Sequence, residues 1–97
     1  MQFFFRGAPK QAVLSDPPPD MMEKAREDWA VARRYYRDGI FRSIWRMGNG
    51  VVAICEADSR DQLVSLLSEL PMARAGLIDI DVQELSPYPG YAPELAN

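Results

Sequence analysis

The chain has 97 residues, the size of one small domain, and we expect residues 1–97 to form a single domain with a modest hydrophobic core. Its formal net charge is −3, from 11 lysines and arginines against 14 aspartates and glutamates, so it lacks the basic surplus typical of nucleic-acid-binding proteins. It contains no histidine and one cysteine, which excludes an internal disulfide and leaves no cluster of the commonest metal ligands. No apolar run approaches the roughly 20 residues of a membrane span. We therefore expect a soluble cytoplasmic protein without metal or coenzyme, and without nucleic acid or membrane as a partner.

The first third of the sequence predicts a strand, a loop and a long helix. Residues 2–6 are rich in aromatic side chains, which favour a strand because they suit a pleated surface. Residues 8–19 contain Pro9 and three consecutive prolines, which predict a stiff Pro-rich surface loop. Asp20 is a candidate N-cap, and apolar residues then recur at steps of three and four until Gly39. This spacing predicts an amphipathic helix that ends at Gly39.

A β-hairpin is expected next in the chain. The apolar runs 40–47 and 51–57 flank the dipeptide Asn49-Gly50, which is the strongest short-range signal for a two-residue hairpin loop. A type I′ turn fits this dipeptide, because both of its central residues have positive φ. Cys55 lies within the second of these strands, where we expect it to be a small buried residue and not a nucleophile.

A second helix and a last strand complete the predicted elements. Ser59 with Gln62 three residues later forms a capping-box pattern before a leucine-rich segment, and Pro71 stands just beyond its end. Residues 77–85 alternate between apolar and polar side chains, which predicts a half-buried strand. Residues 86–97 form a Pro-rich tail.

The predicted order β-α-β-β-α-β is that of a ferredoxin-like α+β fold, with two helices on one face of a four-stranded antiparallel sheet. The strands carry apolar residues on both sides, so the face away from the helices needs a cover, and a second copy is the simplest one. We therefore expect a homodimer or a higher homo-oligomer. In this topology the second and fourth strands are the edges, so Arg42 and Arg46 of one subunit would face Asp79 and Asp81 of another. The alternative is that these four are solvated edge charges.

Asp28 is the main candidate for a catalytic residue. It falls between Ala25 and Ala32, within the apolar side of the first long helix. Removal from water disfavours the charged carboxylate and raises its pKa, which suits a group that accepts a proton and later returns it. The alternative is that Asp28 lies at the margin of the apolar side and pairs with Arg42, Arg46 or a nearby helix cation.

Other side chains near this position are candidates for the same site. Tyr35 follows Asp28 on the helix and offers a hydroxyl, although aromatic residues at helical spacing are more often part of the core. Arg42 and Arg46 offer positive charge for a substrate carboxylate, and the sequence leaves open which of them faces the site. Trp29 and Trp45 offer apolar surface for substrate binding.

Several of these segments resemble the muconolactone Δ-isomerase-like family, the small ferredoxin-like subunits of bacterial aromatic compound catabolism. The resemblance covers roughly residues 20–90 and rests on five features. They are the long helix that ends at Gly39, the tripeptide Ile44-Trp45-Arg46, the leucine-rich helix that closes in Leu70-Pro71, the strand Asp79-Ile80-Asp81-Val82, and the proline-bearing tail. The resemblance implies a dimeric α+β barrel that assembles into larger rings, with the family's acidic position at Asp28 and its Trp-Arg pair at Trp45 and Arg46.

The family reaction moves a ring double bond within an unsaturated lactone, by taking a proton from one carbon and returning it to another. The resemblance therefore implies a cofactor-independent isomerase acting on a muconolactone-like lactone or an aromatic-derived acid. Asp28 would shuttle the proton, Arg46 or Arg42 would bind the substrate carboxylate, and Tyr35 or a backbone N–H would stabilise the oxyanion.

Two alternative functions stay open from the sequence. One is a non-catalytic or diverged dimeric barrel that binds a small apolar acid. The other is a cofactor-free cyclase or monooxygenase that acts on a polyketide-like ring, in an aromatic cleft around Trp29 and Trp45.

Two departures from the family pattern bear on the site. The usual family acid is a glutamate, so Asp28 is about one methylene shorter. Residues 72–76 replace an aromatic, proline-containing stretch, and we expect a longer loop there.

Overall fold

The computed structural model describes residues 1–91. It contains one sheet of four antiparallel strands in the order β2-β3-β1-β4. The strands are β1 (Gln2–Pro9), β2 (Phe41–Met47), β3 (Gly50–Glu56) and β4 (Ile78–Leu85). The helices are α1 (Gln11–Ser15), α2 (Met21–Arg37), α3 (Arg60–Ser68), α4 (Pro71–Arg74) and the 3₁₀ turn η1 (Pro89–Tyr91). The predicted α+β order is confirmed, with β2 and β4 at the two edges of the sheet. Residues 92–97 of the predicted tail lie outside the described residues.

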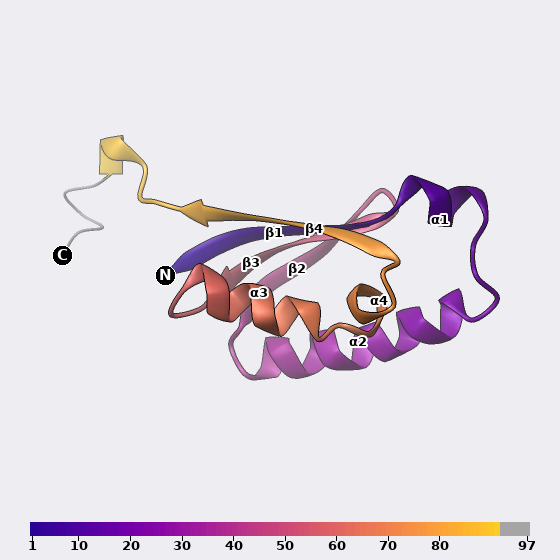
Figure 1. The fold of residues 1–97 in the computed structure, drawn as a ribbon. Coiled ribbons are helices and arrows are strands. Elements are labelled where there is room, and N and C mark those ends of the chain that lie inside the picture. The colour runs from indigo at the N-terminus through magenta and orange to yellow at the C-terminus, as the bar shows by residue number, and fades with distance from the viewer. Residues whose placement is uncertain (92–97) are drawn as a thin grey trace.

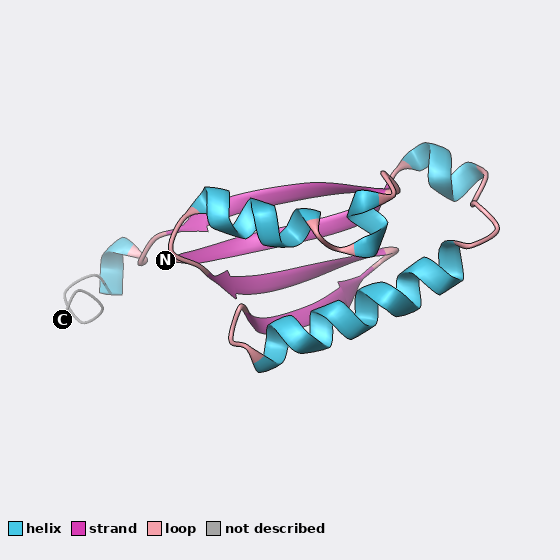
Figure 2. Cartoon of the chain, turned by 60° about the horizontal axis from the view of Figure 1, so that its bottom comes forward, coloured by secondary structure: helices cyan, strands magenta, loops and turns pink. Residues whose placement is uncertain are grey.

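Helices α2, α3 and α4 lie on the same face of the sheet, and α1 lies beyond the sheet at the end of β1 (Figures 1 and 2). The core lies between this face and the helices, because apolar side chains of the strands and helices meet there and leave water. Its most deeply buried side chains are Phe3, Phe5, Phe41, Cys55, Leu63 and Leu67. The expectation that Cys55 is buried is confirmed.

The structure corrects the loop predicted for residues 8–19. Ala8 and Pro9 extend β1, where they pair with Asp79 and Ile78 of β4, and Gln11–Ser15 form the short helix α1. Pro9 can end a strand because it lacks only the N–H group, and its carbonyl remains available. The irregular segment is therefore limited to the residues around the three consecutive prolines.

The predicted hairpin is confirmed, but its turn lies one residue earlier than predicted. Met47 pairs with Gly50, so the loop residues are Gly48 and Asn49. Gly48 has φ of +60°, whereas neither Asn49 nor Gly50 has positive φ, so the type I′ turn is wrong. Positive φ at the first loop residue alone is the pattern of a type II′ turn, which favours glycine there. Gly50 is needed for another reason, since a Cβ atom at this position would overlap the carbonyl oxygen of Gly7 in β1.

Two of the predicted helix signals, Gly39 and Ser59, are confirmed, whereas Asp20 precedes α2 but its side chain makes no capping hydrogen bond. At the end of α2, Gly39 has φ of +82°, its N–H donates to the Tyr36 carbonyl, and the N–H of Ile40 donates to the Tyr35 carbonyl. This is the Schellman arrangement that satisfies the last carbonyls of a helix. At the start of α3, the Ser59 hydroxyl accepts the N–H of Gln62 at 3.1 Å.

The loop predicted for residues 72–76 is a helical turn in the structure. Pro71 occupies the first position of α4, which suits proline because the first N–H of a helix has no partner within the helix. The turn ends at Gly76, which has φ of +72°. As a result, α4 packs against α2 and closes one side of the space between α2 and the sheet.

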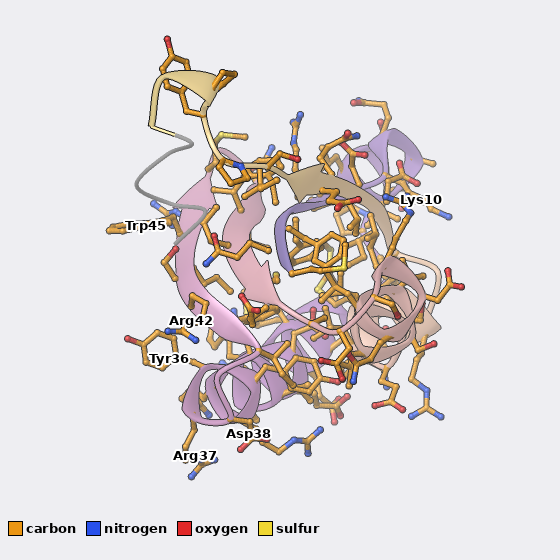
Figure 3. All side chains as sticks on the ribbon, turned by 90° about the vertical axis from the view of Figure 1, so that its left-hand side faces the viewer. Lys10, Tyr36, Arg37, Asp38, Arg42 and Trp45 are labelled. Carbon is orange, nitrogen blue, oxygen red and sulfur yellow. The ribbon has the colours of Figure 1, made fainter. Side chains whose placement is uncertain are left out.

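The sheet face opposite to the helices, here called the open face, carries several exposed apolar side chains. Trp45 is 67 % exposed and Met47 48 % exposed, and both project from β2 on this side. Figure 3 shows Trp45 pointing away from the molecule and from α2. No helix within residues 1–91 has the length and apolar character that crossing a bilayer requires.

Candidate functional site

A cavity of about 280 Å³ lies between α2, α4 and the hairpin end of the sheet. Its walls are mostly apolar and come from every layer of the fold. They include Phe5, Ala25, Trp29, Phe41, Ile44, Val51, Leu70, Met72 and Ile78. Among the described residues, its lining contains two charged side chains, Asp28 and Arg46. The cavity is therefore an apolar space with one acidic and one basic group.

Asp28 reaches this cavity because it lies on the side of α2 that faces the sheet. Its carboxylate oxygen Oδ1 accepts the backbone N–H of Met72 at 2.8 Å. Burial raises the pKa of Asp28 above its ordinary value, the Met72 hydrogen bond lowers it, and the nearby negative charge of Glu27 raises it. Desolvation is the largest of these effects, so the net direction is upward.

Asp28 makes no ion pair with an arginine or lysine among residues 1–91. The alternative in which it only neutralises Arg42, Arg46 or a helix cation is therefore not found in the structure. Instead, its hydrogen bond takes an N–H in the first turn of α4, which has no acceptor within its own helix. Asp28 thus links α2 to α4.

The two candidate arginines lie in different places. Arg46 pairs with Val51 of β3, faces the helices and lines the cavity. Arg42 lies at a β-bulge between Phe41 and Ser43, is exposed, and is absent from the cavity lining. Figure 3 shows it on the outer side of β2. Of the two arginines, Arg46 is the one that can meet a molecule held beside Asp28.

The bulge also explains why the faces of β2 differ from the simple alternation in the sequence. Without it, Phe41 and Trp45 would share one face. The extra residue places Phe41 in the core, 1 % exposed, whereas Trp45 projects from the open face. The pairing of Arg46 with Asp79 and Asp81 of another subunit stays a prediction. In this chain Arg46 faces the cavity, whereas the two aspartates alternate with the core-facing Ile80 and so lie on the opposite face of the sheet.

Tyr35 is part of the core and does not line the cavity. Its hydroxyl donates to the Leu66 carbonyl at 2.8 Å and lies 3.4 Å from Oε2 of Glu69. Burial, followed by the negative charge of Glu69, raises the pKa of this hydroxyl. The geometry therefore places Tyr35 at the junction of α2 and α3 and not beside Asp28.

Of the two tryptophans, Trp29 lines the cavity while remaining 54 % exposed, and Trp45 does not line it. Among residues 1–91, the two tryptophans therefore do not form a shared aromatic cleft. Leu70 and Met72 also line the cavity, although neither was predicted to belong to the site. A proline that opens a helical turn, here Pro71, was the one local signal that could have placed these residues beside the long helix.

Comparison with known proteins agrees with this architecture. The sequence profile of the family described as muconolactone delta-isomerase matches residues 10–90. The chain belongs to the muconolactone delta-isomerase family. It is thus a member of a family of enzymes that process small molecules, and the resemblance seen in the sequence is confirmed. No curated protein sequence matches the chain.

Two solved structures show the same fold. A crystal structure of muconolactone isomerase has a TM-score of 0.73 and 22 % identity, with 92 % of each chain covered. The 5-chloro-2-hydroxyhydroquinone dehydrochlorinase of Burkholderia phenoliruptrix, in complex with 2,5-dihydroxybenzoquinone, has a TM-score of 0.68 and 17 % identity, with 91 % of this chain and 96 % of that chain covered. At these identities the likeness concerns the fold.

Among residues 1–91, no group of three or more acidic, cysteine or histidine side chains could hold a metal ion.

Proposed function

We propose that this protein is a cofactor-independent isomerase that shifts a double bond in an unsaturated lactone bearing a carboxylate. The observation that carries the proposal is the apolar cavity whose two charged lining side chains, among the described residues, are Asp28 and Arg46. A volume of about 280 Å³ suits a compact single-ring molecule, since it lies just below the usual range of small-molecule sites. The name of the family and that of the first structural neighbour support this class of reaction.

In the proposed mechanism, Asp28 acts first as a base and then as an acid. Its carboxylate removes a proton from a carbon next to the conjugated system of the lactone, so a C–H bond breaks and an O–H bond forms. The released electron pair moves into a dienolate whose charge rests on the lactone carbonyl oxygen. The Asp28 carboxyl then returns the proton to another carbon of the dienolate, which creates the new C–H bond and leaves the double bond shifted.

Arg46 binds the carboxylate of the substrate in this proposal. A guanidinium offers two parallel N–H donors to a carboxylate, and such a pair fixes orientation as well as position. The apolar walls hold the ring of the substrate in this proposal. A raised pKa suits Asp28 to this task, because a carboxylate with higher proton affinity is a stronger base toward a carbon acid.

The variant Asp28→Asn tests the proposal directly. The asparagine side chain keeps an oxygen that can accept the N–H of Met72, so the link between α2 and α4 is retained, but an amide cannot carry the proton. We expect kcat on muconolactone, followed by the loss of the ultraviolet absorbance of the conjugated lactone, to fall by about 100-fold or more. Binding of the lactone, measured by calorimetry, should change little.

Two results would contradict the isomerase, and each would favour one of the two alternative functions. Wild-type protein that binds the lactone but does not turn it over, with the same affinity in Asp28→Asn, would identify a binding module. Oxygen uptake with a polyketide-like ring, recorded with an oxygen electrode, would identify a monooxygenase.

A further inference from the structure

The two oxygens of the Asp28 carboxylate are in different surroundings. Oδ1 accepts the Met72 N–H at 2.8 Å, whereas no hydrogen bond or ion pair joins Oδ2 to any of the residues 1–91. Since Asp28 also lines the cavity, Oδ2 is the oxygen available to a bound molecule. We propose that Oδ2 is the oxygen that transfers the proton, and that the backbone N–H of Met72 is a positioning group that holds Oδ1. This inference rests on the proposed isomerase and assigns the parts of its site.

The Met72 N–H is suited to this role because it has no other partner. Met72 is the second residue of α4, so its N–H has no acceptor within the helix, and Pro71 before it has no N–H at all. Met72 is 8 % exposed, so water has little access to replace Asp28 as the acceptor. A buried donor without a partner would cost stability, so the burial of the Met72 N–H also favours its hydrogen bond to Asp28.

The donor itself is held firmly by the hydrogen bonds of α4. The N–H of Arg74 donates to the Leu70 carbonyl at 2.9 Å, and that of Ala75 to the Pro71 carbonyl at 3.0 Å. The carbonyl of Met72 accepts the N–H of Leu77, also at 2.9 Å. Because Leu70 and Met72 also form part of the cavity wall, the turn that fixes the carboxylate is the one that bounds the substrate space. A fixed base saves the entropy of orienting it at each turnover.

The charged groups that face Asp28 are few. Glu27 is its neighbour on α2, Arg46 of β2 lines the same cavity, and the cavity residues from β1, β4 and α4 are uncharged. The Met72 N–H is thus the one hydrogen-bond donor within residues 1–91 that stabilises the ionised form of this carboxylate by direct contact. Its removal is expected to raise the pKa of Asp28 further, since the hydrogen bond lowers it.

A first experiment uses the wild-type chain and needs no substrate. In a pH titration followed by NMR, the Met72 amide proton should move with the same midpoint as the side-chain carboxyl carbon of Asp28, because the strength of their hydrogen bond depends on the carboxylate charge. The same amide proton should lose this transition in Asp28→Asn. A Met72 amide proton that does not follow the Asp28 midpoint would overturn the positioning role.

A second experiment deletes the donor alone. Replacing Met72 by its α-hydroxy acid analogue changes the amide between Pro71 and Met72 to an ester, which keeps the side chain and removes the N–H. The matched control is the same change at Ala73, whose N–H has no acceptor among the described residues. The ester at Met72 also weakens the Pro71 carbonyl as an acceptor, and the ester at Ala73 weakens the Met72 carbonyl in the same way. Because each protein has one weakened acceptor at the end of α4, the two differ mainly in the contact with Asp28.

We expect the ester at Met72 to raise the Asp28 midpoint, to shift the acid limb of kcat/KM to higher pH, and to lower kcat/KM by about 10- to 100-fold, the usual loss for one hydrogen bond to a charged group. The ester at Ala73 should leave the midpoint and the limb where they are. Equal midpoints in the two esters would overturn the positioning role even if the enzyme is active. A raised midpoint in a protein without isomerase activity would instead contradict the proposed function and leave the assignment of the Met72 contact intact.

Discussion

Asp28 combines two properties that are rarely compatible at the surface of a protein, since it is partly removed from water and yet is not neutralised by a cation among the described residues. Its hydrogen bond to the Met72 N–H compensates for part of the lost hydration, while desolvation still dominates and raises its pKa. This places a carboxylate with increased proton affinity beside an apolar space. Carboxylates with a raised pKa in a cavity are candidates for functional groups.

The raised pKa of Asp28 leads to a prediction for stability. A group whose pKa is higher in the folded than in the unfolded protein contributes stability below its unfolded value, here the ordinary 3.8, and this contribution is lost as the pH rises through the folded value. The free energy of unfolding of the wild type, relative to that of Asp28→Asn, should therefore be most favourable in acid and should decline toward neutral pH. Urea unfolding of both proteins across this range checks the sign, and an opposite trend would mean that the pKa is lowered.

The two arginines of β2 provide a matched pair for the binding of the substrate. Arg46→Met should raise KM by about 10- to 100-fold with a smaller effect on kcat, because a charge-assisted contact made equally in ground state and transition state is lost. Arg42→Met removes the same charge outside the cavity and should leave both constants close to those of the wild type. Equal effects in steady-state kinetics of the two variants would contradict the assignment of Arg46.

At the scale of elements, α2 is held by contacts along one side, and these contacts set the position of Asp28. Near its middle, Asp28 connects it to α4, and near its end, Tyr35 packs edge-on against Phe41 and donates to the Leu66 carbonyl of α3. The short α4 closes the cavity because Leu70-Pro71 starts a new helical turn at once after α3. The packing of the helices therefore determines both the shape of the cavity and the orientation of the Asp28 carboxylate.

Tyr35→Phe separates the structural role of this residue from the catalytic role that the sequence suggested. The variant keeps the ring in the core and removes one buried hydrogen bond, so we expect it to lower the free energy of unfolding by about 1 kcal/mol. The proposed isomerase activity should remain, since the hydroxyl points toward α3 and not into the cavity. A loss of kcat comparable to that of Asp28→Asn, with unchanged stability, would restore Tyr35 as a catalytic candidate.

At the scale of the whole molecule, the open face is the feature that a single chain does not explain. Helices cover one side of the sheet, and the other side exposes Trp45 and Met47 (Figures 1 and 3). A large exposed tryptophan on an uncovered sheet face is typical of an interface, because its burial removes much apolar surface from water. A homodimer formed through this face remains our prediction, as does the dimeric barrel.

The variant Trp45→Asp tests this interface. We expect the wild type to sediment as a dimer or a larger oligomer, and Trp45→Asp to shift it toward monomer in analytical ultracentrifugation. Tyr36→Asp is the control, since Tyr36 is exposed to a similar degree, 59 %, but lies on α2 instead of the open face. A monomeric wild type, or an equal shift in both variants, would argue against an interface on this face.

Local interactions explain which parts of the protein the sequence determined by itself. The order of the four strands and of the two longer helices, the end of α2 at Gly39 and the start of α3 at Ser59 depend on periodicity and caps, which neighbouring residues create. The inward position of Asp28 also followed from periodicity along α2. These features are readable because each depends on residues within one or two turns of the chain.

Only the tertiary structure decided how these elements meet. The partner of Asp28 is 44 positions further along the chain, and no local pattern could have named the Met72 N–H. The β-bulge at Arg42 reverses the faces of β2, which places Arg46 at the cavity and Trp45 on the open face. The close approach of the Gly7 backbone, and not the turn, is the reason why position 50 requires glycine. Sequence periodicity assigns side chains to the faces of one element, but contacts between distant elements are set by packing, and packing decided which charges share the cavity.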